Sequence, residues 1–443
     1  MPKPLVREYN QSRILQNRNK PICLAPFKSL RFLPDGNITV CCHNNSFSLG
    51  KYPDTSIMSA WNSNELEFLR KKMDKADFSA GCQDCLSSFE EKQFASVNPL
   101  LYENYSDNSK FPVILDFKSA TECNLMCVMC SEYSSSAIRR CTDSKLYSEA
   151  SVYDKDFVEE IKTIIPHIAE ARFSGGEPFL NDIYYDLWYA IIEKNPNCKI
   201  SIQTNGTIYN SKVQSILESG QIHINVSVDA VDPELYQKIR INGNLEKVKE
   251  NIFKFSEYSK LKNTSFGITA CAMRDNAYEL SEIFKLANSL GAKLWYSDVH
   301  FPLVNALWVM KSDELDKIVE FLNNQKLELN SEMSLHNAVV FKDLIGRIEQ
   351  LALAANRREH SSKLLINPTK LVEKLSKVMR KSTLVHPGTW TKIKLALSQF
   401  NECKMIDLSI EISKYYNTDF AFQQLGQMSY ETLIKNFACL IVD

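Results

Sequence analysis

The chain lacks an excess of either charge and lacks long apolar runs. Lys and Arg total 52 against 53 Asp and Glu, so no net field favours nucleic acid or an acidic membrane as a partner. Residues 1–20 contain no apolar segment of a signal peptide, and no apolar run approaches the length of a membrane span. We therefore expect a cytoplasmic protein, with no nucleic-acid or membrane partner indicated, whose partners depend on local sites.

Cysteine, in contrast, is abundant, with 13 residues in a chain of 443. In a chain of this length without a signal peptide, reduced thiols and metal ligation fit better than a disulfide framework. Eight cysteines form two groups in the sequence: Cys23, Cys41, Cys42, Cys82 and Cys85, then Cys123, Cys127 and Cys130. The other five are isolated, and we expect small buried side chains there: Cys141, Cys198, Cys271, Cys403 and Cys439.

The second group has the spacing C-x3-C-x2-C and directly follows the apolar run Val113 to Phe117. Cysteine thiolates are the usual ligands of iron–sulfur clusters, and a loop after a strand can turn three sulfurs to one side. Three protein ligands leave a fourth position open, as in catalytic zinc sites. The alternative is a structural zinc knuckle, for which Cys141 or His167 would be the fourth ligand, although neither stands at a familiar interval.

This loop resembles the signature of the radical S-adenosylmethionine (SAM) enzymes. The resemblance implies a [4Fe-4S] cluster on Cys123, Cys127 and Cys130, with SAM bound to the iron that has no cysteine ligand. It also implies reductive cleavage of SAM to a 5′-deoxyadenosyl radical, which abstracts hydrogen from a substrate, and an electron donor such as flavodoxin or ferredoxin. Most of that chemistry belongs to the cofactor, and the protein supplies positioning and exclusion.

The N-terminal segment predicts a small cysteine-rich module. Two short strands, 29–33 and 38–42, flank a Pro-Asp-Gly-Asn turn, and a helical stretch then leads to a C-x2-C pair. The segment resembles the SPASM or twitch module of some radical SAM enzymes, which here would precede the barrel. That resemblance implies a second, auxiliary [4Fe-4S] cluster, for which Cys42 or His43 could replace Cys41 and a zinc ribbon is the alternative. The expected ligands are Cys23, Cys41, Cys82 and Cys85.

The central segment alternates strand-like and helical runs, which indicates parallel β/α units. The expected strands are 113–118, 171–174, 199–204, 223–228, 266–272 and 293–297. Six strands are too few for a closed eightfold barrel and match the partial (β/α)6 barrel that radical SAM enzymes usually have. In such folds, ligands gather at the carboxyl ends of the strands.

Several residues at those ends resemble SAM-binding motifs of the family. The GGEP motif after the second strand implies contacts with the amino group of SAM, and the TNG segment after the third strand recurs in relatives. Ser227 and Arg240 match a Ser and an Arg that hold the SAM carboxylate, and Met129 replaces an aromatic residue near the adenine. The expected cofactor-binding residues are Met129, Gly175, Gly176, Glu177, Thr204, Asn205, Ser227 and Arg240. No catalytic acid or base is assigned.

The C-terminal segment shows apolar residues at helical spacing in three stretches, 314–325, 342–360 and 368–382. We therefore divide the chain into an auxiliary-cluster module (1–110), a partial radical SAM barrel (111–300) and a helical region (301–443). The expected function is a radical SAM enzyme that acts on a peptide or protein side chain or on a small polar metabolite. Net oxidation of the substrate, with the auxiliary cluster as the electron acceptor, would fit this function. The alternative is a non-catalytic zinc-binding interaction protein.

Overall fold

The structure is a computed structural model of the chain, and it divides into two compact units. The residues that it describes are 2–13, 20–45, 47–90, 94, 97–105, 110–142, 151–300 and 302–360. The first unit comprises Met1–Glu122, Ser148–Ile202 and Gln214–Ile222. The second unit comprises Cys123–Tyr147, Gln203–Val213 and His223–Asp443.

The N-terminal part of the first unit contains the expected hairpin among short helices. Strands β1 (Ser29–Phe32) and β2 (Ile38–Thr39) pair antiparallel. Gly36 in their turn has a φ of +87°, and a Cβ there would lie 2.4 Å from the carbonyl oxygen of Tyr52, so the turn requires glycine. The helices are α1 (Lys3–Ser12), α2 (Ala25–Lys28), α3 (Ile57–Trp61), α4 (Asn64–Asp74), α5 (Gln83–Glu90) and η2 (Asn98–Tyr102).

The same unit contains a parallel sheet, and β1 belongs to it. Its strands stand in the order β2-β1-β3-β5-β6, with β3 (Ile114–Phe117), β5 (Glu170–Phe173) and β6 (Lys199–Thr204). Between and after them lie α7 (Lys155–Ile164), η3 (Ile165–His167), η4 (Pro178–Leu180), α8 (Asp182–Lys194) and α9 (Ser211–Ser219). Because β1 pairs in parallel with β3, the N-terminal segment supplies a strand to the sheet, which we did not expect from the sequence.

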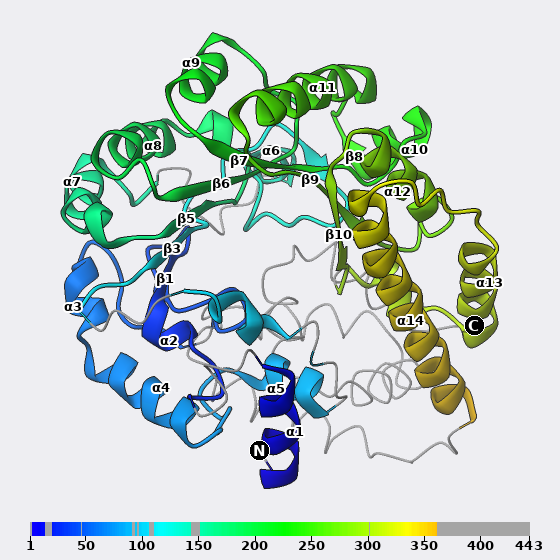
Figure 1. The fold of residues 1–443 in the computed structure, drawn as a ribbon, viewed down its shortest axis with the longest axis horizontal. Coiled ribbons are helices and arrows are strands. Elements are labelled where there is room, and N and C mark those ends of the chain that lie inside the picture. The colour runs from blue at the N-terminus through cyan, green and yellow to red at the C-terminus, as the bar shows by residue number, and fades with distance from the viewer. Residues whose placement is uncertain are drawn as a thin grey trace. The chain divides into compact units, whose positions relative to one another are not determined.

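One face of this sheet is aromatic and packs against helices. The ring of Phe117 stacks on Phe32 at 5.3 Å and on Phe173 at 4.7 Å. Phe157 of α7 lies 5.2 Å from Phe32, and Trp188 of α8 lies 5.5 Å from Phe173. Figure 1 shows α7 and α8 along one side of these strands. Side chains alternate across a strand, so the residues between these aromatics face away from the helices.

The second unit contains three parallel strands, β7 (Ile222–Ser227), β9 (Phe266–Ala272) and β10 (Lys293–Asp298), in the order β7-β9-β10. Buried and half-buried residues alternate strictly along β7 and β9, as expected for strands with one apolar face. A short antiparallel ladder joins β4 (Met126–Cys127) to β8 (Arg240–Ile241). The helices between these strands are α6 (Ser136–Thr142), α10 (Pro233–Ile239), α11 (Leu245–Lys262) and α12 (Leu280–Ser289).

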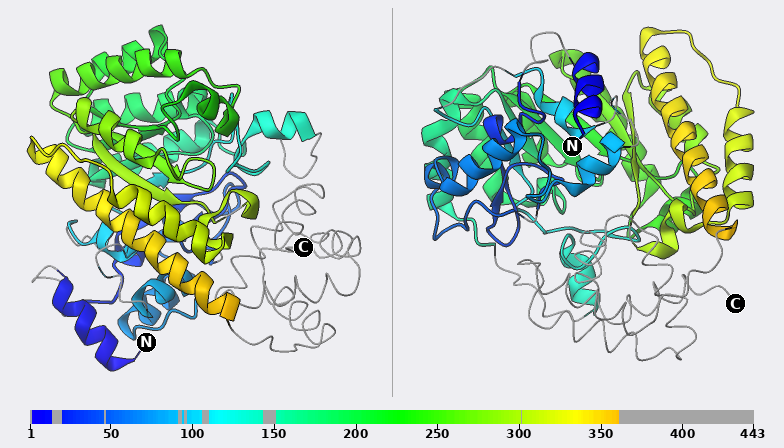
Figure 2. Two further views of the ribbon diagram at one scale, coloured as in Figure 1. Left: turned by 90° about the vertical axis from the view of Figure 1, so that its right-hand side faces the viewer. Right: turned by 90° about the horizontal axis from the view of Figure 1, so that it is seen from below.

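Helices follow β10, as expected. After η5 (Leu303–Asn305) and η6 (Leu307–Val309), α13 (Ser312–Asn323) and α14 (Glu332–His360) lie side by side (Figure 2). Phe341 of α14 packs against Phe284 of α12 and Tyr296 of β10 at 5.3 and 6.3 Å. The third expected helix, 368–382, lies outside the described residues.

All six strands expected in the central segment are present, so the predicted α/β fold class is confirmed. The proposed boundary at residue 110 does not separate the strands, because β1 pairs with β3 across it. Of the helices in the described ranges, none combines the length and the apolar character that a bilayer span needs.

Candidate metal centres and cofactor site

The C-x3-C-x2-C loop follows β3, as predicted, and its sulfurs meet backbone and side-chain donors. Cys127 is buried, whereas Cys123 and Cys130 are half-buried. A hydrogen bond between the Cys127 and Cys130 thiols raises the pKa of Cys127, which burial raises further, and lowers the pKa of Cys130. The amide N–H of Leu125 points at Sγ of Cys123 at 3.5 Å. Amide donors of this kind are a normal surrounding of cluster sulfurs.

Two short strands fix Arg240 against this loop. Arg240 is the register partner of Cys127 in the β4–β8 ladder, and its Nη1 lies 4.0 Å from Sγ of Cys127. Its Nη2 makes an ion pair of 2.7 Å with Asp229, which is completely buried and also accepts the N–H of Cys271. The buried Nε of Arg240 has no hydrogen-bond partner. An unpaired buried donor is costly. The Nε of Arg240 can therefore lower the energy of the site by donating to a further acceptor.

The GGEP turn packs on the residues that directly precede Cys123. Gly175 and Gly176 have φ of +88° and +53°. A Cβ on Gly175 would lie 2.7 Å from the carbonyl oxygen of Ala120, and one on Gly176 would lie 2.2 Å from that of Glu122. The N–H of Glu177 donates to Glu122 at 2.7 Å. The two glycines therefore allow the GGEP turn to approach this backbone closely.

The fully buried carboxylate of Glu177 accepts the N–H of Phe179 at 3.2 Å and so caps η4. The expected contact of this carboxylate with SAM stays a prediction.

The TNG turn holds the cluster loop from within the second unit. Asn205 donates to the side-chain oxygen of Asn124 at 3.0 Å, and its Nδ2 lies 4.0 Å from Sγ of Cys123. The hydroxyl of Thr204 accepts the N–H of Gly206 at 3.1 Å and so stabilises the turn. Asn124 was not identified from the sequence, although it lies between two of the cysteines.

The remaining two expected residues are partly accessible. Ser227 is half-buried at the end of β7, and its hydroxyl accepts a hydrogen bond of 2.6 Å from Gln203. Met129 is half-buried within the cysteine loop. Their expected contacts with SAM stay predictions.

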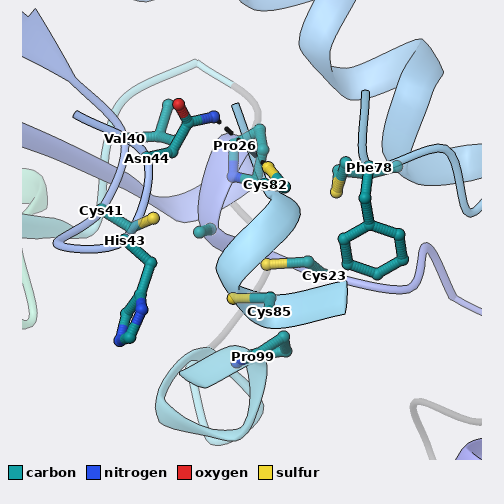
Figure 3. A pocket seen from close by; sticks show the side chains of 12 residues that line it. Cys23, Pro26, Val40, Cys41, His43, Asn44, Phe78, Cys82, Cys85 and Pro99 are labelled. Atoms are coloured by element: carbon teal, nitrogen blue, oxygen red, sulfur yellow. Dashed lines mark hydrogen bonds between the residues drawn. The ribbon is translucent and has the colours of Figure 1, made fainter. Parts of the chain in front are cut away.

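The four N-terminal cysteines expected to bind the auxiliary cluster line one cavity (Figure 3): Cys23, Cys41, Cys82 and Cys85. Cys82 and Cys85 lie three residues apart at the start of α5, a spacing that puts both on one side of a helix. Cys41 is buried, whereas Cys42 is exposed and does not line the cavity. His43 is exposed at its edge. Of the two adjacent cysteines, Cys41 lines the cavity and Cys42 does not, and the choice of Cys41 as the ligand stays a prediction.

These four thiols lie close enough to oppose one another's ionisation. Burial raises the pKa of Cys23 to about 11. Burial and the neighbouring cysteines also raise the pKa of Cys41 and Cys85. Asn44 donates to Sγ of Cys82 at 3.3 Å. A bound metal would reverse these increases in thiol pKa, because a coordinating thiol is deprotonated.

The donor sets at both places therefore fit iron–sulfur clusters. At the N-terminal cavity, four thiols surround one space, and at the central loop, three cysteines adjoin an unpartnered arginine donor. Among the described residues, no three His, Cys, Asp or Glu side chains converge as a site for a single metal ion.

Comparison with known proteins agrees with these two sites. A family model of the radical SAM superfamily matches residues 118–270, and a model of the SPASM iron–sulfur cluster-binding domain matches residues 23–86. Residues 118–270 are therefore a radical SAM domain, and residues 23–86 ahead of it are a SPASM domain. Members of this superfamily are enzymes, and the two matches confirm SAM and iron–sulfur clusters as the expected cofactors.

Among curated proteins, the chain is similar to the "Probable GTP 3′,8-cyclase" of Methanocaldococcus jannaschii. Identity is 30% over 176 residues, which cover 39% of this chain and 54% of the relative. The GTP 3′,8-cyclase of Limosilactobacillus fermentum is 28% identical over 29% of this chain and 37% of its own length. The chain thus spans about half or less of the curated relatives that it matches.

Two solved structures share low similarity with the chain. One is native anSMEcpe with bound AdoMet, with 20% identity, coverage of 48% of this chain and 58% of that chain, and a TM-score of 0.36. The other is Streptococcus suis SuiB bound to S-adenosylmethionine, with 14% identity, coverage of 58% and 61%, and a TM-score of 0.37.

Proposed function

We propose that this enzyme cleaves SAM reductively at a cluster held by Cys123, Cys127 and Cys130 and abstracts a hydrogen atom from an organic substrate. The observation that carries the proposal is the β4–β8 ladder, which places Arg240 beside the loop of these three cysteines. The buried Nε of Arg240 has no partner. When bound, the cluster and SAM supply the 5′-deoxyadenosyl radical. The electron comes from a donor such as flavodoxin or ferredoxin.

In this proposal the protein's own residues orient the cofactor. The unpartnered Nε of Arg240 and the hydroxyl of Ser227 are donors for the SAM carboxylate, because a carboxylate accepts from guanidinium and hydroxyl groups. Asp229 holds the Arg240 guanidinium in place through its ion pair. Glu177, whose N–H donates to the carbonyl oxygen of Glu122, is the acceptor for the SAM ammonium group. Thr204 and Asn205 position the loop, and Met129 packs near the adenine.

The auxiliary site gives the proposed reaction an oxidative outcome. Cys23, Cys41, Cys82 and Cys85 would hold a second cluster in the N-terminal cavity, which would supply an acceptor for the electron left on the substrate after hydrogen abstraction. The buried sulfurs that line the cavity support this role. A peptide or protein side chain and a small polar metabolite are the two substrate classes. The relatives named GTP 3′,8-cyclase match 29–39% of this chain, so their substrate is not assigned to it.

The test is an anaerobic assay. The chain is reconstituted with iron and sulfide, dithionite and SAM are added, and 5′-deoxyadenosine is measured by mass spectrometry. We expect about eight irons per chain, four for each cluster, and formation of 5′-deoxyadenosine. Replacement of Cys127 by Ala should abolish cleavage and leave about four irons.

The matched control is Cys198→Ala, because Cys198 is a buried thiol outside both groups. Retained cleavage in Cys127→Ala would overturn the assignment of the loop. A colourless protein loaded with zinc at both groups would instead support the non-catalytic alternative.

A further inference from the structure

Charged side chains line the face of the first unit's sheet that points away from the helices. Arg31 on β1 is the register partner of Asp116 on β3, and Asp116 is the partner of Arg172 on β5. The residue after each of them is one of the stacked phenylalanines that pack against α7 and α8. Alternation therefore places these three charged residues in one row on the opposite face.

This row is poorly accessible to solvent. The side chains of Arg31 and Asp116 are 8% and 13% exposed, and that of Arg172 is 24% exposed. Removing charged groups from water is costly unless they are well paired. A sheet that needed only stability would have apolar residues here, as it has on its other face.

The pairing within this face leaves one positive charge uncompensated. Arg31 forms an ion pair with Asp116. Arg172 and Lys199 share the single carboxylate of Glu170, at 2.6 and 3.0 Å. The same carboxylate accepts hydrogen bonds from Ser201 and Tyr105. Both of its oxygens are therefore engaged, and three cations face two carboxylates.

One of the two guanidinium groups also keeps unused capacity. The buried Nε of Arg31 has no hydrogen-bond partner. Arg172 directs Nε and Nη2 to Glu170, at 2.8 and 2.6 Å, and its guanidinium lies 5.8 Å from the centre of the Tyr102 ring. Rigid donor geometry of this kind suits planar or tetrahedral oxyanions.

We infer that Arg31 and Arg172 form a binding site for an anionic group of the substrate, a carboxylate or a phosphate. This inference rests on the proposed function and narrows the substrate to molecules that carry such a group. A bound oxyanion would accept from the unpartnered Nε of Arg31 and balance the excess positive charge. Asp116, between the two arginines, then fixes Arg31 and limits the site to one anion.

The experiment is equilibrium dialysis of the reconstituted full-length chain against two labelled probes, pyrophosphate and succinate, at constant ionic strength. We expect saturable binding of about one anion per chain by at least one probe, and the probe that binds identifies the phosphate or carboxylate source. Arg172→Gln and the paired replacement Arg31→Gln with Asp116→Asn should each weaken binding about tenfold or more. Arg274→Gln is the control, because Arg274 is 43% exposed in a surface ion pair.

A measurement on the protein without substitutions covers the case in which a variant does not fold. Phenylglyoxal modification of arginines is mapped by mass spectrometry with and without the bound probe, and protection is expected at Arg172 but not at Arg274. Absence of saturable binding, or equal affinity of Arg172→Gln and Arg274→Gln, would overturn the inference. Dithionite-driven SAM cleavage is assayed in the same samples. Loss of cleavage with retained anion binding refutes the proposed function alone, and the reverse result refutes the anion site alone.

Discussion

Replacement of Gly176 by Ala tests whether the GGEP turn positions the cluster loop through backbone contact. Gly176 has a φ of +53°, and its added Cβ would lie 2.2 Å from the carbonyl oxygen of Glu122, the residue before Cys123. Because Cβ atoms essentially never come within 3.0 Å of such an atom, the two backbone segments must separate by about 1 Å. A displacement of about 1 Å in a reacting geometry can reduce a rate about 100-fold.

The loss of stability in Gly176→Ala has two causes, and the same replacement at a second glycine, Gly291, separates them. A left-handed φ costs a non-glycine residue about 1–2 kcal/mol, and overpacking adds about 1–3 kcal/mol. Gly291 has a similar φ of +65°, but a Cβ there would meet no atom within 4 Å. Gly291→Ala should therefore lose only the first part, whereas Gly176→Ala should lose both.

Two assays read the two effects. Urea unfolding gives the free energies, and anaerobic formation of 5′-deoxyadenosine gives the cleavage rate. We expect Gly291→Ala to cleave SAM at the original rate and Gly176→Ala to be about 100-fold slower. Equal unfolding energies and equal cleavage rates for the two variants would refute the reasoning.

Three further predictions concern other parts of the protein. Cys41→Ser should lower the iron content from about eight to about four per chain, while Cys42→Ser should keep about eight; equal iron contents would contradict the assignment of Cys41. Asp229→Asn should destabilise the fold by about 3 kcal/mol in urea unfolding, because it leaves the charge of Arg240 buried without its partner. The double replacement with Arg240→Gln should recover most of this loss, and failure to recover it would refute the ion-pair explanation. Burial would raise the pKa of Glu170, but Arg172 and Lys199 lower it to about 2. Its stabilising contribution, about 3 kcal/mol, should therefore be complete above about pH 5 and lost as pH falls toward 2. Glu170→Gln should flatten this part of the stability profile, and an unchanged profile would contradict the prediction.

The sequence predicted the features that depend on local pattern. Strand-like runs between helical runs identified β7 and β9, and the C-x3-C-x2-C spacing identified the central loop. The distinction between Cys41 and Cys42 depends on the side of the chain that faces the cavity, and two adjacent cysteines give no local sign of it.

Features that depend on distant pairing could not be predicted. The four residues of β1 carry no sign that they pair with β3, more than 80 residues later. The ion pair of Arg240 with Asp229 and the row of Arg31, Asp116 and Arg172 likewise depend on strand neighbours and register. One local sign was available, because charged residues alternate with apolar ones in β5.

The parallel pairing of β1 with β3 also limits how the chain can be divided. Removal of residues 1–110 to isolate the radical SAM domain would leave the edge of β3 without its partner. An exposed strand edge is a template for aggregation, so such a truncated chain should be poorly soluble. A chimera that exchanges the SPASM domain between enzymes would have to carry β1 with it. The auxiliary-cluster segment is, in this sense, an inseparable part of the sheet.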